Sequence, residues 1–101
     1  MGKEEILQIL QNHLPYMKEN FGLRSIALFG SYAKENANAN SDIDLLVDIA
    51  KEKKTFRNFM ALCYYLEELL GKKVELVTKQ SLSPYIGPHI LKTVAYVPLA
   101  G

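Results

Sequence analysis

The chain has little of several features that mark other classes of protein. Its single cysteine, Cys63, excludes an internal disulfide bond and a cluster of cysteines around zinc. No apolar run approaches the roughly 18 residues of a membrane-spanning helix, and no signal peptide is recognisable, so we expect a cytoplasmic protein with no membrane partner. The formal net charge is only +1, from 12 basic and 11 acidic residues. There is thus no strong nucleic-acid signal, and any polyanion must be bound locally.

The length of 101 residues predicts a single domain, residues 1–101. Hydrophobic residues make up 49% of the chain and charged residues 23%, as in an ordinary globular protein. A domain of this size has a small core, so its stability can depend on a partner. The Gly-x-x-x-x-Gly-Lys pattern is absent, which excludes a P-loop ATPase.

The pattern of apolar residues alternates between the periods of helices and strands. Strands are expected at residues 24–29, 42–48 and 73–77. Helices are expected at residues 3–13, 31–35, 56–70 and 88–96. Pro15 is expected to break the first helix, because proline removes a backbone N–H and crowds the preceding turn. This alternation predicts an α/β (α+β) architecture, with a small mixed three-stranded sheet flanked by about four helices.

The clearest amphipathic helix follows Thr55, a good N-cap residue, and ends at Gly71. Its apolar residues recur at helical spacing, which predicts one buried stripe. The members of this expected stripe are Phe56, Phe59, Met60, Cys63, Leu66 and Leu70.

Two carboxylates open the second expected strand, at Asp42 and Asp44. Successive side chains of a strand point to opposite faces, so these two share a face, with Cα atoms roughly 6.5 Å apart. The intervening apolar side chains face the core. Aspartate is depleted in strands, and carboxylates are ligands that Mg²⁺ prefers. Two such acids can bridge a pair of metal ions about 3.5–4 Å apart, the spacing used in phosphoryl displacement.

A Gly-Ser pair, Gly30-Ser31, ends the preceding strand. Glycine lets the backbone approach a ligand closely, and a helix that begins at Ser31 offers its hydroxyl and free N–H groups to a polyphosphate. The alternative is that Gly30-Ser31 is an ordinary turn and Ser41-Asp42 an ordinary loop end. The occurrence of both pairs in this order, and so close together, favours the phosphate-binding interpretation.

Two runs together carry a family resemblance, Leu28-Phe29-Gly30-Ser31-Tyr32-Ala33 and Ser41-Asp42-Ile43-Asp44-Leu45. They resemble the signature of the DNA polymerase β-type nucleotidyltransferases, and in particular its minimal (MNT-type) branch. The run Ser83-Pro84-Tyr85-Ile86 and the chain's ending are also typical of that branch. The resemblance implies the nucleotidyltransferase fold, ATP as the substrate and two Mg²⁺ ions.

The resemblance also implies roles for individual residues. In this superfamily a third carboxylate, on a later strand, joins the aspartate pair to bind metal and help deprotonate the attacking hydroxyl. Glu75 is in the right place, although the MNT branch commonly has aspartate there. Asp42, Asp44 and Glu75 are therefore the implied catalytic and metal-binding residues. A solvated edge position is the alternative for Glu75.

The implied nucleotide-binding residues are Gly30, Ser31, Lys34 and Ser41. Gly30 and Ser31 would hold the β and γ phosphates. The branch usually continues with Arg-Gly where this chain has Lys34-Glu35. Lysine keeps a positive charge but lacks the bidentate fork of arginine, and Glu35 brings a negative charge towards the expected phosphates.

Many MNT-type proteins are antitoxins encoded beside a HEPN ribonuclease toxin. Catalytic members silence the toxin by transferring AMP from ATP to a tyrosine near its ribonuclease site. This domain is too small to carry the separate nucleic-acid-binding domains of polymerases, which favours a protein acceptor. Two alternatives stay open, a non-catalytic antitoxin that acts by binding alone and a nucleotidyltransferase that acts on RNA or a small molecule.

Overall fold

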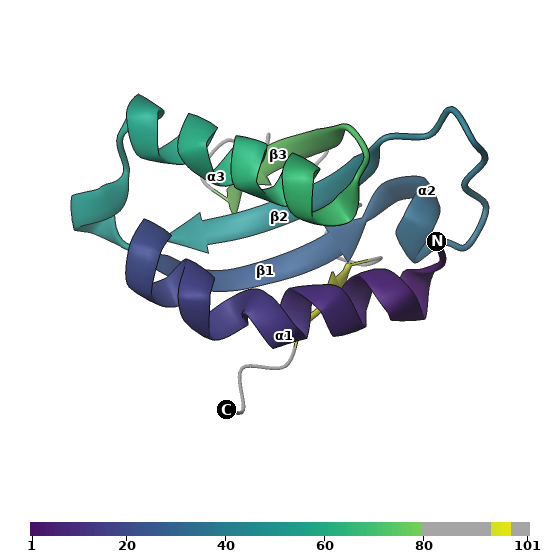
Figure 1. Ribbon diagram of the computed structural model, residues 1–101, viewed down its shortest axis with the longest axis horizontal. Helices are drawn as coiled ribbons and strands as arrows, with labels where there is room; N and C mark the ends of the chain where they lie inside the picture. The colour runs from purple at the N-terminus through teal and green to yellow at the C-terminus, as the bar shows by residue number, and fades with distance from the viewer. Residues whose placement is uncertain (80–93, 98–101) are drawn as a thin grey trace.

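A mixed four-stranded sheet forms the centre of the computed structural model, which describes residues 1–79 and 94–97 (Figure 1). The strands lie in the order β3-β2-β1-β4. β1 is antiparallel to both of its neighbours, whereas β2 and β3 are parallel. The strands are β1 (Leu23–Phe29), β2 (Ile43–Ile49), β3 (Val74–Thr78) and β4 (Ala95–Tyr96).

Two long helices lie side by side across one face of this sheet (Figure 1). They are α1 (Lys3–Phe21) and α3 (Phe56–Leu70), and the short helix α2 (Gly30–Ala33) follows β1 directly. One 3-10 turn, Lys51–Lys53, precedes α3. The predicted α+β architecture and the mixed sheet are confirmed, with a fourth strand that was not expected. Among the described residues, no helix has the length and apolarity needed to cross a membrane.

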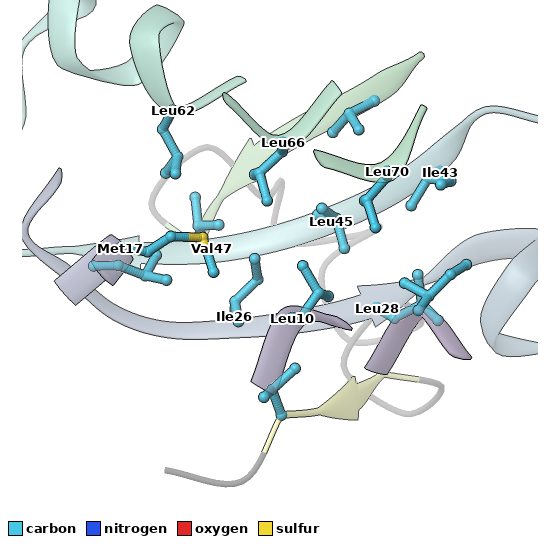
Figure 2. Close-up of a cluster of buried hydrophobic side chains, with 14 of the residues drawn as sticks. Leu10, Met17, Ile26, Leu28, Ile43, Leu45, Val47, Leu62, Leu66 and Leu70 are labelled. Carbon is cyan, nitrogen blue, oxygen red and sulfur yellow. The ribbon is translucent and has the colours of Figure 1, made fainter. Parts of the chain in front are cut away.

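The hydrophobic core fills the layer between the sheet and the two long helices, as Figure 2 shows. Ile43, Leu45 and Val47 of β2 are fully buried there. Because side chains alternate along a strand, Asp44 lies on the opposite face of the sheet. The buried side chains of β2 thus fix the face on which Asp44 lies, and this alternation of faces agrees with the prediction from the sequence.

Helix α1 does not break at Pro15, so that prediction was wrong. Pro15 lies on the exposed side of a continuous 19-residue helix. The buried stripe continues on both sides of it, with Leu14 and Met17 packed into the core. This packing outweighs the single backbone hydrogen bond that proline cannot make. Gly22, at a φ of 68°, ends the helix in the left-handed conformation.

The expected ends of α3 are confirmed, but its expected stripe is partly wrong. The Thr55 side chain accepts a hydrogen bond from the Asn58 N–H, and Gly71 ends the helix. Phe56, however, is 80% exposed, and the fully buried Leu62 was missed. The fully buried positions of α3 begin only at Leu62, so Phe56 lies outside the core, whereas Phe59 is partly buried and packs against it.

The helix expected at residues 88–96 is contradicted at its end, where Ala95 and Tyr96 form β4. They pair with β1, and the Val97 N–H continues the ladder by donating to the Ile26 carbonyl at 3.0 Å. The free edge of β1 supplies these hydrogen bonds, and Val97 is buried while Tyr96 is exposed, as in a strand. Residues 88–93 and the run 83–86 lie outside the described residues.

Candidate active site

Asp44 and Glu75 lie side by side on the face of the sheet that points away from α1 and α3. The parallel register of β2 and β3 pairs these two residues directly. On the other side of Asp44, the antiparallel register places Phe29 at the end of β1. Neighbouring strands are about 4.8 Å apart, so the two carboxylates are neighbours. The structure therefore brings together Asp44 and Glu75, two of the three acids that were expected to meet.

The closeness of these acids changes the chemistry of Asp44. Its pKa is raised to about 6, first by burial, then by the charge of Glu75 and a hydrogen bond with it, and finally by the charge of Asp42. Every charged group that contributes to this shift is acidic, and no described lysine or arginine offsets them. The site thus concentrates negative charge around Asp44.

Asp42 lies just before β2 and is exposed. Its charge reaches Asp44, yet within residues 1–79 and 94–97 no three acidic, histidine or cysteine side chains are gathered closely enough to hold a metal ion. Of the three expected metal ligands, Asp44 and Glu75 are therefore paired, and Asp42 is near enough for its charge to act on Asp44. Unbalanced carboxylate oxygens are the donor set that Mg²⁺ prefers, so the chemistry of these residues fits that ion.

Gly30 gives the Asp44 carboxylate the room that it occupies. Its φ is +72°, and a Cβ atom built there would overlap Asp44 Oδ2 and lie 3.0 Å from Asp44 Cγ. A side chain at this position would therefore push the carboxylate aside as well as strain the backbone. We expected Gly30 to let the backbone approach a ligand closely. The structure shows that Gly30 leaves room for the carboxylate of Asp44.

The other expected nucleotide-binding residues occupy different positions around this turn. Ser31 is half-buried in α2 and directly follows Gly30, the residue that lies against Asp44. Lys34 is exposed at the end of α2. The Ser41 hydroxyl accepts a hydrogen bond from the Asn38 N–H at 3.0 Å, so it fastens the loop between α2 and β2.

Glu35 occupies a backbone conformation that suits glycine. Its φ is 59°, and it is the one described residue other than glycine with a positive φ. A side chain in this left-handed region costs roughly 1–2 kcal/mol. The MNT branch usually has glycine here, so the replacement by glutamate adds both strain and a negative charge beside the turn.

Lys72 holds the loop between α2 and β2, a role that the sequence did not indicate. Its Nζ donates to the Ala39 carbonyl at 3.2 Å and lies 5.8 Å from the centre of the Tyr32 ring. A hollow of about 400 Å³ lies here, with Tyr32, Glu35 and Lys72 among its lining residues, and none of the three acids lines it. Asp44 and Glu75 instead lie on the sheet itself, and Asp42 lies just before it.

Comparison with known proteins identifies the family. The sequence model described as "Nucleotidyltransferase domain" matches residues 10–97. This chain belongs to the nucleotidyltransferase family. It is also 45% identical over 94 residues to the protein adenylyltransferase MntA of Thermococcus cleftensis, and the match covers 93% of this chain and 94% of that relative.

Solved structures support the same assignment for this nucleotidyltransferase. One, described as a candidate minimal nucleotidyltransferase, has a TM-score of 0.79 and 29% identity, and covers 98% of this chain and 97% of its own. A chain from a toxin–antitoxin complex with AMP-PNP has a TM-score of 0.68 and 26% identity, and covers 97% and 73% respectively. The resemblance to the minimal, MNT-type branch is confirmed.

Replacing Gly30 should cost more than replacing another left-handed glycine. Gly71 has a φ of +69°, and no atom lies within 4 Å of the position that a Cβ atom would take there, so Gly71→Ala adds backbone strain alone, about 1 kcal/mol. Gly30→Ala adds the displacement of Asp44, and we expect a total loss of about 2–3 kcal/mol in urea unfolding. Equal losses in the two variants would show that Asp44 moves aside without cost.

The raised pKa of Asp44 predicts a dependence of stability on pH. Because the folded state binds this proton more tightly than the unfolded state, stability falls as pH rises from about 4 through 6. Asp44→Asn removes that cost, so we expect it to be more stable than wild type by about 1 kcal/mol at pH 8, allowing for solvent screening. The difference should vanish near pH 4.

The control is Asp48→Asn, which removes the same charge four residues further along β2. Urea unfolding of the three proteins from pH 4 to 8 makes the comparison. A stability difference between Asp44→Asn and wild type that stays constant over this range would contradict the prediction.

Proposed function

We propose that this protein is an Mg²⁺-dependent adenylyltransferase that transfers AMP from ATP to a tyrosine of a HEPN-family toxin and thereby neutralises it. The identity to a protein adenylyltransferase over nearly the whole chain supports the reaction type. The likeness to a chain from a toxin–antitoxin complex with AMP-PNP supports the partner class and the nucleotide.

The observation that carries the proposal is the direct pairing of Asp44 with Glu75 beside Gly30. Two adjacent carboxylates on neighbouring strands repel each other and lower the stability of the sheet, so a purely structural role does not explain them. A reaction that concentrates phosphate charge and cations at one place uses such a pair. The pair is thus explained by phosphoryl chemistry.

Each residue has a distinct task in this reaction. The backbone of Gly30 and Ser31 would hold the β and γ phosphates, and Lys34 would add positive charge at the end of the turn. Glu75 would accept the proton of the tyrosine hydroxyl. The tyrosine oxygen then attacks the α-phosphorus, the bond from that phosphorus to the bridging oxygen breaks, and pyrophosphate leaves.

Asp42, Asp44 and Glu75 would hold the Mg²⁺, which when bound supplies neutralisation of the phosphate charge. Burial and the neighbouring negative charges together raise the pKa of Asp44, and the bound ion would balance those charges. Most of the rate enhancement would come from positioning and electrostatic stabilisation. Ser41, through its bond to Asn38, would act by holding the loop that leads to Asp42.

The test uses ATP labelled at the α-phosphate, Mg²⁺ and the protein encoded by the neighbouring gene. We expect the wild type to label a tyrosine of that protein, and Asp44→Asn to reduce the rate by at least about 100-fold. Asp48→Asn, on the same strand, should transfer at the wild-type rate. Circular dichroism checks that each variant is folded.

The other outcomes identify the alternatives. A stable complex with the partner but no label would indicate an antitoxin that acts by binding alone. Label on RNA or on a small molecule, and on no protein, would indicate a different acceptor. Equal rates for wild type and Asp44→Asn would remove the carboxylates from the mechanism.

Two substitutions of Glu35 separate its backbone strain from its charge. Glu35→Gly should raise the free energy of unfolding by about 0.5–1 kcal/mol, because it relieves a left-handed conformation. Glu35→Gln keeps the strain and should leave stability unchanged. Both remove an exposed anion, so both should lower the Kd of Mg²⁺-ATP about two- to threefold in calorimetry. A Kd unchanged in both variants would place Glu35 away from the phosphates.

A further inference from the structure

Tyr96 lies on the same face of the sheet as the carboxylates. In the antiparallel pair of β1 and β4, Tyr96 is directly opposite Ala27. Ala27 is two residues before Phe29, which is opposite Asp44. Residues opposite each other share a face, and so do residues two apart on one strand. The tyrosine therefore shares the side of the sheet on which phosphoryl chemistry is proposed.

The ring of Tyr96 is open to groups that reach in from solvent. The side chain is 44% exposed, and the Nζ atom of Lys79 lies 5.2 Å from the ring centre. Lys79 follows β3, at the other edge of the described sheet, and is itself exposed. Its side chain thus extends over the sheet to reach an aromatic face that is not packed into the core.

The separation between Tyr96 and the carboxylates suits a nucleotide. From strand spacing and rise per residue, the Cα atoms of Tyr96 and Asp44 are about 12 Å apart. A tyrosine side chain on one side and a nucleoside on the other can span this distance. We propose that Tyr96 is the stacking platform for the base of the bound nucleoside triphosphate, an inference that rests on the proposed function.

Lys79 would give way to the base. A cation over an exposed aromatic ring is held weakly, whereas stacking of a base on such a ring is the stronger contact. Every base has an aromatic face, so Tyr96 would contribute affinity for nucleotides in general. The displaced ammonium group would remain on the side of the sheet that receives the phosphates.

The experiment measures binding to the full-length protein by calorimetry, with Mg²⁺-ATP and with Mg²⁺-tripolyphosphate, which has no base. We expect Tyr96→Leu to raise the Kd of Mg²⁺-ATP about tenfold and to leave the Kd of tripolyphosphate unchanged. Tyr96→Phe keeps the ring and should restore the affinity for ATP. Tyr64→Leu is the matched control, because Tyr64 is an exposed tyrosine of α3, on the other side of the sheet.

Three results would overturn the inference. An unchanged Kd of Mg²⁺-ATP in Tyr96→Leu would show that the base does not stack on Tyr96. An equal rise in the Kd of ATP and of tripolyphosphate in that variant would indicate that Tyr96 has a structural role. Weak ATP binding in Tyr96→Phe would show that the hydroxyl, not the ring, matters. If the wild type shows the expected binding pattern but labels no partner, the proposed function fails and the platform stands.

Discussion

The structure depends at its functional end on the direct contact of two carboxylates, Asp44 and Glu75, on neighbouring parallel strands. Like charges in this position are unfavourable, and burial together with the charge of Glu75 raises the pKa of Asp44. The fold sustains the pair because the other face of β2 is anchored by fully buried side chains. The pair also requires glycine at position 30, because any side chain there would collide with Asp44.

Much of this arrangement could be predicted from local patterns. The alternation of Asp42 and Asp44 with apolar residues indicated both the strand and its two faces, and Thr55 and Gly71 marked the ends of α3. The meeting of the second and third strands followed from the family resemblance. Such predictions succeed where neighbouring residues in the sequence decide the outcome.

The errors arise where distant parts of the chain decide. Pro15 has a poor intrinsic propensity for helix, but Leu14 and Met17 bury enough surface to keep α1 continuous. Tyr96 was assigned to a helix, whereas the unpaired edge of β1 draws it into a strand. Phe56 has the right spacing for the core, yet the buried part of α3 starts only later. None of these outcomes is visible in a short window of sequence.

The parallel pairing of β2 with β3 has a kinetic consequence. Asp44 and Glu75 are far apart in the sequence, and the whole of α3 lies between them. Contacts across such a separation require loop closure first, so they form late along a folding pathway. We expect the repulsion between the two acids to act only once these strands have paired, so that it mainly speeds unfolding and shortens the lifetime of the folded state.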